Sequence, residues 1–128
     1  GFVPKEGEKN LYTAGRLEQL LNVDKRLVMV DFTADWCLTC KTLEKTVLNT
    51  DAIQMALKEK EVVQLVADWT EVNSKTGLEI EAELERLGKG KQLPMIAFYS
   101  PEQEAEPKTL VAVYTASDIH KILGQLKK

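Results

Sequence analysis

Residues 28–41 read VMVDFTADWCLTCK and contain both cysteines of the chain, Cys37 and Cys40. The cysteines follow residues 26–32, a short run that is largely apolar on both faces, as is typical of a central β-strand. The pattern from residue 37 to residue 48 predicts a helix. The sequence therefore places the cysteine pair where a strand ends and a helix begins.

Outside this stretch, helical and strand patterns alternate along the chain. The expected helices are 13–22, 37–48, 52–60, 78–88 and 117–128, and the expected strands are 26–32, 61–69, 93–99 and 108–115. Such alternation predicts a parallel sheet, to which the last two strands add an antiparallel edge as a hairpin. The result is an α/β fold with a central mixed sheet of about four strands flanked by helices. We expect a lead-in segment at residues 1–12 and one domain at residues 13–128.

Several single residues carry structural predictions. Ser74 and Ser117 are candidate N-caps for the last two helices, and Gly88 is a candidate C-terminal stop. We expect Trp69 to pack in the interior and His120 to lie on the surface.

Composition and charge exclude some classes of function. A chain of 128 residues fits one domain. Its net charge of −3, with no cluster of basic residues, argues against a nucleic-acid partner. No apolar run approaches the 18 or so residues of a membrane span, and the polar start does not read as a signal peptide. A domain cut from a larger exported or membrane protein would look the same.

The spacing of the two cysteines suits redox chemistry. A thiol at a helix N-terminus is stabilised as the thiolate, the species that attacks disulfides. Cys40 lies one turn later, within reach of a mixed disulfide formed by Cys37. Two alternatives remain on residues alone. Both cysteines could be buried structural residues, or they could bind zinc, although His120 brings the ligands of this kind to three rather than four.

The quoted residues resemble the signature of the thioredoxin superfamily: an apolar strand, an aspartate six residues before the first cysteine, and Trp-Cys-x-x-Cys-Lys. LPMIAFY, residues 93–99, resembles the strand that carries the cis-proline of that family. The resemblance runs from about residue 13 to the end in element order. It is strongest to the C-terminal periplasmic domain of DsbD-type transmembrane reductases, through ADWC, through Glu44 in CKTLEK, and through VADWTEVN.

This resemblance implies a role for each residue of a site. Cys37 attacks and Cys40 resolves the mixed disulfide, while Asp31, the one acidic residue in its strand and so expected to be buried, accepts protons. Glu44 would lie on the cysteine face of the helix and oppose thiol ionisation. The residues expected to contact a partner are Trp36, Leu38, Thr39, Leu93 and Pro94, with a cis bond before Pro94. No cofactor and no metal is implied.

The resemblance also implies a function. The domain would be a monomeric thiol–disulfide reductase or electron relay in the periplasm, a soluble part of an inner-membrane protein. It would take electrons from a membrane-embedded cysteine pair and pass them to a thioredoxin-like or DsbD N-terminal-type domain. The alternatives are a free-standing reductase or isomerase, and a non-catalytic chaperone or metal carrier. Gln64 stands where many thioredoxins have a strand lysine. The Leu38-Thr39 spacer lacks the histidine of strongly oxidising relatives, which favours a reductant.

Overall fold

The computed structural model describes residues 10–102 and 105–127. Its helices are α1 (Ala14–Glu18), α2 (Leu38–Leu43), α3 (Asp51–Glu59), α4 (Lys75–Leu87) and α5 (Ala116–Gln125), with π-helical turns η1 (Gln19–Val23) and η2 (Glu44–Leu48). Its strands are β1 (Leu27–Thr33), β2 (Val62–Asp68), β3 (Met95–Tyr99) and β4 (Lys108–Val111). Helices and strands thus follow the expected order, and η1 and η2 continue α1 and α2.

The four strands form one mixed sheet in the order β2-β1-β3-β4. β1 runs parallel to β2, from Leu27 opposite Val62 to Thr33 opposite Asp68, and antiparallel to β3. β4 returns antiparallel along β3 as the edge strand of a hairpin. Every residue of β1 is buried, as predicted from its two apolar faces. The predicted mixed sheet of four strands is therefore confirmed.

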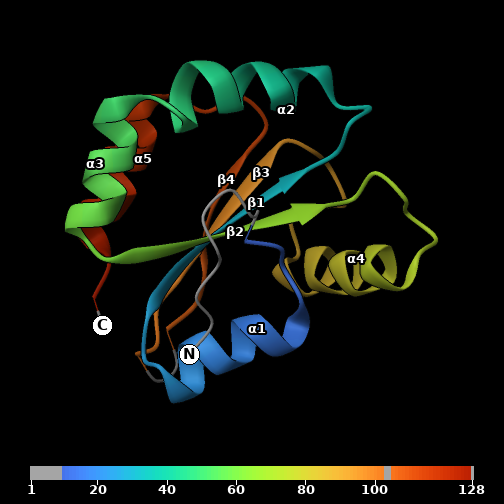
Figure 1. Cartoon of the computed structure of the whole chain (residues 1–128), viewed down its shortest axis with the longest axis horizontal. Helices are drawn as coiled ribbons and strands as arrows, with labels where there is room; N and C mark the ends of the chain where they lie inside the picture. The colour runs from blue at the N-terminus through green and yellow to red at the C-terminus, as the bar shows by residue number, and fades with distance from the viewer. Residues whose placement is uncertain (1–9, 103–104, 128) are drawn as a thin grey trace.

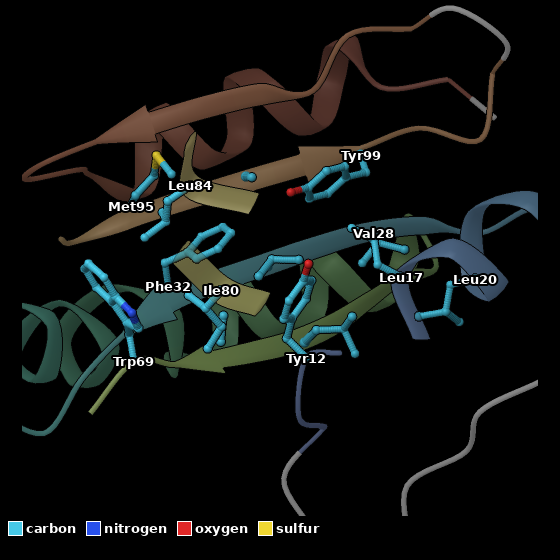
Figure 2. Close-up of a cluster of buried hydrophobic side chains, with 14 residues drawn as sticks. Tyr12, Leu17, Leu20, Val28, Phe32, Trp69, Ile80, Leu84, Met95 and Tyr99 are labelled. Atoms are coloured by element: carbon cyan, nitrogen blue, oxygen red, sulfur yellow. The ribbon is translucent and has the colours of Figure 1, made fainter. Parts of the chain in front are cut away.

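Helices cover both faces of the sheet (Figure 1). α2, α3 and α5 lie on one face, and α1 and α4 lie on the other. Alternate residues of the central strands point to opposite faces, so the apolar side chains form two separate clusters. The cluster under α1 and α4, drawn in Figure 2, includes Tyr12, Phe32, Ile80 and Leu84. The other cluster lies under the helices that follow the cysteines.

Side chains at the helix ends explain most of the boundaries. Ser74 caps α4 by accepting a hydrogen bond from the Gly77 N–H at 3.0 Å, and Gly88 ends that helix with φ of 71°, both as predicted. The prediction of Ser117 as the cap of α5 is wrong. Thr115 caps α5 instead, because the Asp118 carboxylate accepts from the Thr115 N–H while the Thr115 hydroxyl accepts from the Asp118 N–H.

Two segments differ in detail from the expectation. The strand predicted at residues 108–115 ends at Val111, because Ala112 adopts φ of 66° and leaves the extended conformation. Residues 1–9 of the expected lead-in lie outside the described residues, and its residues 10–12 lie against the free edge of β2. The Tyr12 N–H donates to the Val66 carbonyl at 2.8 Å, and the Tyr12 ring is buried in the core.

Candidate functional site

The cysteine pair lies at the C-terminal end of the central strand. β1 ends at Thr33, and Cys37 is the N-cap residue of α2. Cys37 and Cys40 form a disulfide with their Cα atoms 5.3 Å apart. The backbone N–H of Cys40 donates to Cys37 Sγ at 3.2 Å, across the first turn of the helix. The same N–H would stabilise a Cys37 thiolate once the disulfide is reduced.

The two sulfur-bearing residues differ in their access to solvent. Cys40 is only 1% exposed, whereas Cys37 is partly exposed. Exposed apolar side chains flank the accessible cysteine, because Trp36 is 57% exposed and Leu38 is 79% exposed. Thr39 is also exposed. A disulfide of another protein can therefore reach Cys37 but not Cys40.

A pocket of about 180 Å³ lies between β1, β2 and the helix that carries the cysteines. Its lining includes Asp31, Thr33, Lys41, Glu44 and Asp68. Asp31 is buried, as predicted. Its pKa is raised from 3.8 to about 8, mainly by burial and also by the neighbouring Glu44, while the positive charge of Lys41 opposes the rise. Because ionised carboxylates only accept, Asp31 and Glu44 can share a hydrogen bond only when one is protonated.

Two oxygens of this pocket lack partners. Within the described residues, Thr33 Oγ1 and Glu44 Oε2 are buried without a hydrogen bond. The other oxygen of Glu44, Oε1, lies 3.6 Å from Lys41 Nζ. Since buried polar atoms are generally satisfied by protein or by ordered water, the pocket is suited to hold water beside Asp31.

The strand position that differs from many thioredoxins has its own partner. The side-chain amides of Gln64 and Gln54 exchange two hydrogen bonds, at 3.2 and 2.9 Å. Gln64 also lines the pocket of Asp31. Among the described lining residues of that pocket, the cation is Lys41, which comes from the cysteine helix rather than from the strand.

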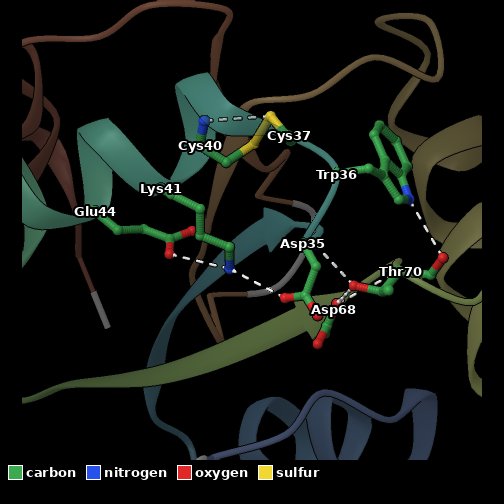
Figure 3. A network of polar contacts seen from close by, with 8 residues as sticks. All are labelled: Asp35, Trp36, Cys37, Cys40, Lys41, Glu44, Asp68 and Thr70. Atoms are coloured by element: carbon green, nitrogen blue, oxygen red, sulfur yellow. Dashed lines mark hydrogen bonds and ion pairs between the residues drawn. A yellow bond between two sulfur atoms is a disulfide. The ribbon is translucent and has the colours of Figure 1, made fainter.

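The loop after β2 contacts the loop before Cys37 (Figure 3). Thr70 Oγ1 accepts from the Asp35 N–H at 2.8 Å, and the Thr70 carbonyl accepts from Trp36 Nε1 at 3.2 Å. Trp36 and Trp69 are also in ring contact, with centroids 6.1 Å apart. Trp69 is buried, as predicted. The two loops thus form one unit around the accessible sulfur.

Pro94 lies at the same end of the sheet. Met95 opposes Phe32 of β1, so the preceding Leu93–Pro94 bond is level with the loop that leads to Cys37. That peptide bond is cis, as the resemblance implied. The Pro94 carbonyl accepts from the Ala112 N–H at 2.9 Å. Pro94 itself is buried and Leu93 is partly buried.

Comparison with known proteins agrees with this geometry. A family model described as thioredoxin-like matches residues 14–101. The chain belongs to the thioredoxin-like family. It is 34% identical over 100 residues to the thiol:disulfide interchange protein DsbD of Salmonella typhimurium, covering 77% of this chain and 16% of DsbD. The corresponding protein of Pasteurella multocida is 31% identical over 114 residues, covering 88% of this chain and 19% of DsbD. This thioredoxin-like chain therefore spans less than a fifth of these relatives.

Solved structures show the same fold. A thioredoxin from Thermus thermophilus superposes with a TM-score of 0.68 at 22% identity, covering 91% of this chain and 85% of that one. The oxidised C-terminal domain of DsbD from Neisseria meningitidis superposes with a TM-score of 0.63 at 20% identity, covering 91% of this chain and 98% of that one. At these identities the likeness establishes the thioredoxin fold.

Other features of the thioredoxin-like chain bear on function. Among residues 10–102 and 105–127, no three His, Cys, Asp or Glu side chains are grouped as metal ligands. No helix in that part of the chain has the length and apolarity needed to cross a bilayer. His120 is exposed, as predicted.

Sequence reasoning did not single out Asp35, Lys41, Asp68 or Thr70 as part of the site. Lys41 and Thr70 stand inside the phrases that carry the resemblance, CKTLEK and VADWTEVN. Position within those phrases is the signal that could have identified them. The contact between Asp35 and Thr70 depends on how two loops distant in the sequence meet.

Proposed function

We propose that this chain is a thiol–disulfide oxidoreductase that passes electrons to other proteins through a reversible Cys37–Cys40 disulfide. One observation carries the proposal: the disulfide joins an accessible helix-cap cysteine to a buried one. This arrangement gives one sulfur to meet a partner and a second to release it. The matching family and the similarity to DsbD support the same chemistry.

The reaction proceeds in two exchanges. The Cys37 thiolate attacks a sulfur of the partner's disulfide; the partner S–S bond breaks, a mixed disulfide forms, and one partner thiolate leaves and takes a proton. The Cys40 thiolate then attacks Cys37 Sγ, which forms the internal disulfide and releases the second partner thiol. Two electrons pass to the partner, and no organic cofactor is required.

Asp31 would accept the proton of Cys40 in the second exchange. A carboxyl group whose pKa is about 8 exists in both protonation states near neutral pH, which suits a group that must accept and return a proton. The adjoining pocket would connect this carboxyl group to solvent. Glu44 would oppose ionisation of the thiols by its own negative charge.

Trp36, Leu38 and Thr39 would form the partner surface beside Cys37. All three are exposed. Leu93 and the cis-Pro94 would complete this surface, with the Leu93 backbone pairing to an extended segment of the partner. This partner surface would thus be largely apolar, with Cys37 as its single reactive sulfur.

The similarity to DsbD supports a specific setting for this exchange. We infer that the domain is a monomer in the periplasm, as a soluble part of an inner-membrane protein. It would take electrons from a membrane-embedded cysteine pair and pass them to a periplasmic thioredoxin-like or DsbD N-terminal-type domain.

The proposal is tested by catalysis and by a redox potential. The chain should accelerate the reduction of insulin by dithiothreitol, and Cys37→Ser should abolish this. Equilibration in thiol buffers, followed by tryptophan fluorescence, should give a potential near or below about −220 mV, as for thioredoxins and glutaredoxins. A value near about −120 mV, typical of a strong oxidant, would reverse the direction of electron flow. Absence of a reversible couple would refute an oxidoreductase and favour a binding module.

A further inference from the structure

The hydroxyl group of Thr70 is held in one orientation. It donates to Asp68 Oδ1 at 2.5 Å, and the Thr70 N–H donates to the same oxygen at 3.1 Å. A hydroxyl group has one hydrogen to donate. Its lone pairs are therefore left to accept, and Thr70 Oγ1 accepts from the Asp35 N–H at 2.8 Å. Asp68 thus fixes the hydroxyl group in the orientation that Asp35 needs.

The main chain of Thr70 binds Trp36, the residue that follows Asp35 in the loop before Cys37. Its carbonyl accepts from Trp36 Nε1 at 3.2 Å. The Trp36 ring lies at 56° to the ring of Trp69, which is buried. Trp36 is nevertheless 57% exposed. One edge of the indole is therefore fixed to the protein while a large part of the ring remains free for contact.

Thr70 consequently holds both residues that precede Cys37, Asp35 by its backbone and Trp36 by its ring (Figure 3). Thr70 and Asp35 are 35 residues apart in the sequence. We propose that Thr70 is a positioning residue, which presets Trp36 for docking of a protein disulfide at Cys37. This inference rests on the proposed oxidoreductase function.

The physical reason is preorganisation. A large side chain that moves freely loses rotamer freedom when a partner binds, and this loss weakens the encounter complex. A ring already held in place avoids most of that loss. A small disulfide reagent reaches Cys37 without contacting Trp36 over a large area. Its reaction rate should therefore not depend on whether the Trp36 ring is held in place. Protein disulfides and small disulfides should therefore respond differently to a change at Thr70.

The test compares two substitutions of Thr70 in the reduced chain. Thr70→Val preserves the shape and the carbonyl that accepts from Trp36, but it removes the hydroxyl group that holds the Asp35 backbone, so it tests whether this anchor of the loop sets the position of Trp36. Thr70→Ser keeps the hydroxyl group. We expect Thr70→Val to slow reduction of a protein disulfide, insulin, about five- to tenfold, mainly through a raised KM. Its rate with the small disulfide 5,5′-dithiobis(2-nitrobenzoate) should stay within about twofold of wild type. Thr70→Ser should restore the insulin rate to within about twofold.

A matched control and a second variant complete the experiment. Thr46→Val removes a hydroxyl group that donates within its own helix, to the Thr42 carbonyl at 2.8 Å, and should change neither rate. Trp36→Phe, which removes the indole N–H, should slow insulin reduction as Thr70→Val does. The double variant, with Trp36→Phe and Thr70→Val, should reduce insulin only slightly more slowly than either single variant. This second variant keeps the test decisive if Thr70→Val fails to fold.

The outcomes separate this inference from the proposed function. A wild-type chain without insulin reductase activity would overturn the function itself. An active wild type with equal insulin rates in Thr70→Val and Thr70→Ser would overturn only the positioning role. The same holds if Thr70→Val slows both disulfides equally, or if Trp36→Phe and Thr70→Val combine as independent losses.

Discussion

The charge of Glu44 raises the pKa of Asp31, although the two residues come from different layers of the fold. Asp31 lies on the central strand, and Glu44 begins the π-helical turn that continues the cysteine helix. Both line one pocket. Burial of Asp31 is the larger cause of its raised pKa, and the neighbouring charge adds to it. The strand that leads to the cysteine pair therefore carries a buried carboxyl group whose pKa, about 8, is close to neutral pH.

This carboxyl group should make stability depend on pH. Its pKa is about 8 in the folded chain and near 3.8 when unfolded, so the folded state holds the proton more tightly. The free energy of unfolding should then fall as pH rises from about 4 to about 8. Asp31→Asn removes this dependence, so the oxidised variant should exceed wild type by on the order of 2 kcal/mol at about pH 9. Urea denaturation across this pH range measures the free energy of unfolding of both proteins. Parallel profiles of this free energy against pH for wild type and Asp31→Asn would contradict the prediction.

Glu44 should affect the thiols by its charge. Glu44→Gln removes a negative charge from the cysteine helix, so the pKa of the Cys37 thiol should fall. Thiolate absorbance against pH in the reduced chain measures this change. Glu59→Gln, on the exposed part of α3, is the matched control and should leave the titration unchanged. An identical Cys37 titration in wild type and Glu44→Gln would exclude Glu44 from tuning the thiols.

The difference in exposure between the cysteines should appear in their alkylation. Cys40→Ser leaves Cys37, which is accessible, and Cys37→Ser leaves Cys40, which is 1% exposed. Iodoacetamide should modify the first variant at least about tenfold faster than the second, because the thiolate must meet the reagent. Mass spectrometry over time gives both rates. Comparable rates would mean that Cys40 opens to solvent once the disulfide is absent.

The last helix offers a direct test of its cap. Thr115→Ala removes the hydroxyl group that accepts from the Asp118 N–H at 3.1 Å, and should lower the free energy of unfolding by about 1 kcal/mol. Ser117→Ala, two residues along, should change it by less than about 0.5 kcal/mol. Denaturation of both variants decides between the positions. A larger loss at Ser117 would contradict the observed capping box.

A buried acid on the opposite face of the sheet should contribute to stability. Tyr99 OH donates to Glu83 Oε2 at 2.5 Å, and Arg86 donates to both carboxylate oxygens at 2.7 and 2.6 Å. Tyr99→Phe leaves Glu83 with one donor fewer and should cost about 1–2 kcal/mol. The control is Tyr114→Phe, since the Tyr114 hydroxyl is buried without a partner among the described residues. Equal losses in thermal or urea unfolding would contradict the role of the Tyr99 hydroxyl.

The sequence predicts what depends on local pattern and fails where distant segments meet. The two-sided apolarity of residues 26–32 identified the central strand, and the position of Cys37 after it identified the helix cap. Thr115 was missed although Thr-x-x-Asp is a readable capping signal, because Ser117 is also a common cap. β4 ends early because the backbone of Ala112 has a positive φ. Alanine seldom adopts this conformation, so the sequence does not indicate it.

The candidate site shows the same division. Asp31 was recognised as buried because it is the one acid in an apolar strand. The contacts of Thr70 with Asp35 and Trp36 were not predictable. These partners are separated from Thr70 by 35 and 34 positions in the sequence, and their loops meet only in the folded chain. Side-chain polarity identifies candidates, but tertiary packing assigns their partners.

The sheet divides the apolar interior into two compartments. Ile80 belongs to the cluster under α1 and α4, and Ile53 belongs to the cluster beneath the cysteine helix and its neighbours. Side chains in different compartments share no packing surface, so substitutions in them should act nearly independently. Apart from Trp69, which contacts Trp36 beside the cysteines, the compartment under α1 and α4 can thus be repacked by evolution or by design, while the other compartment supports the redox helix. The fold thereby separates the part that can vary from the part that must hold its shape.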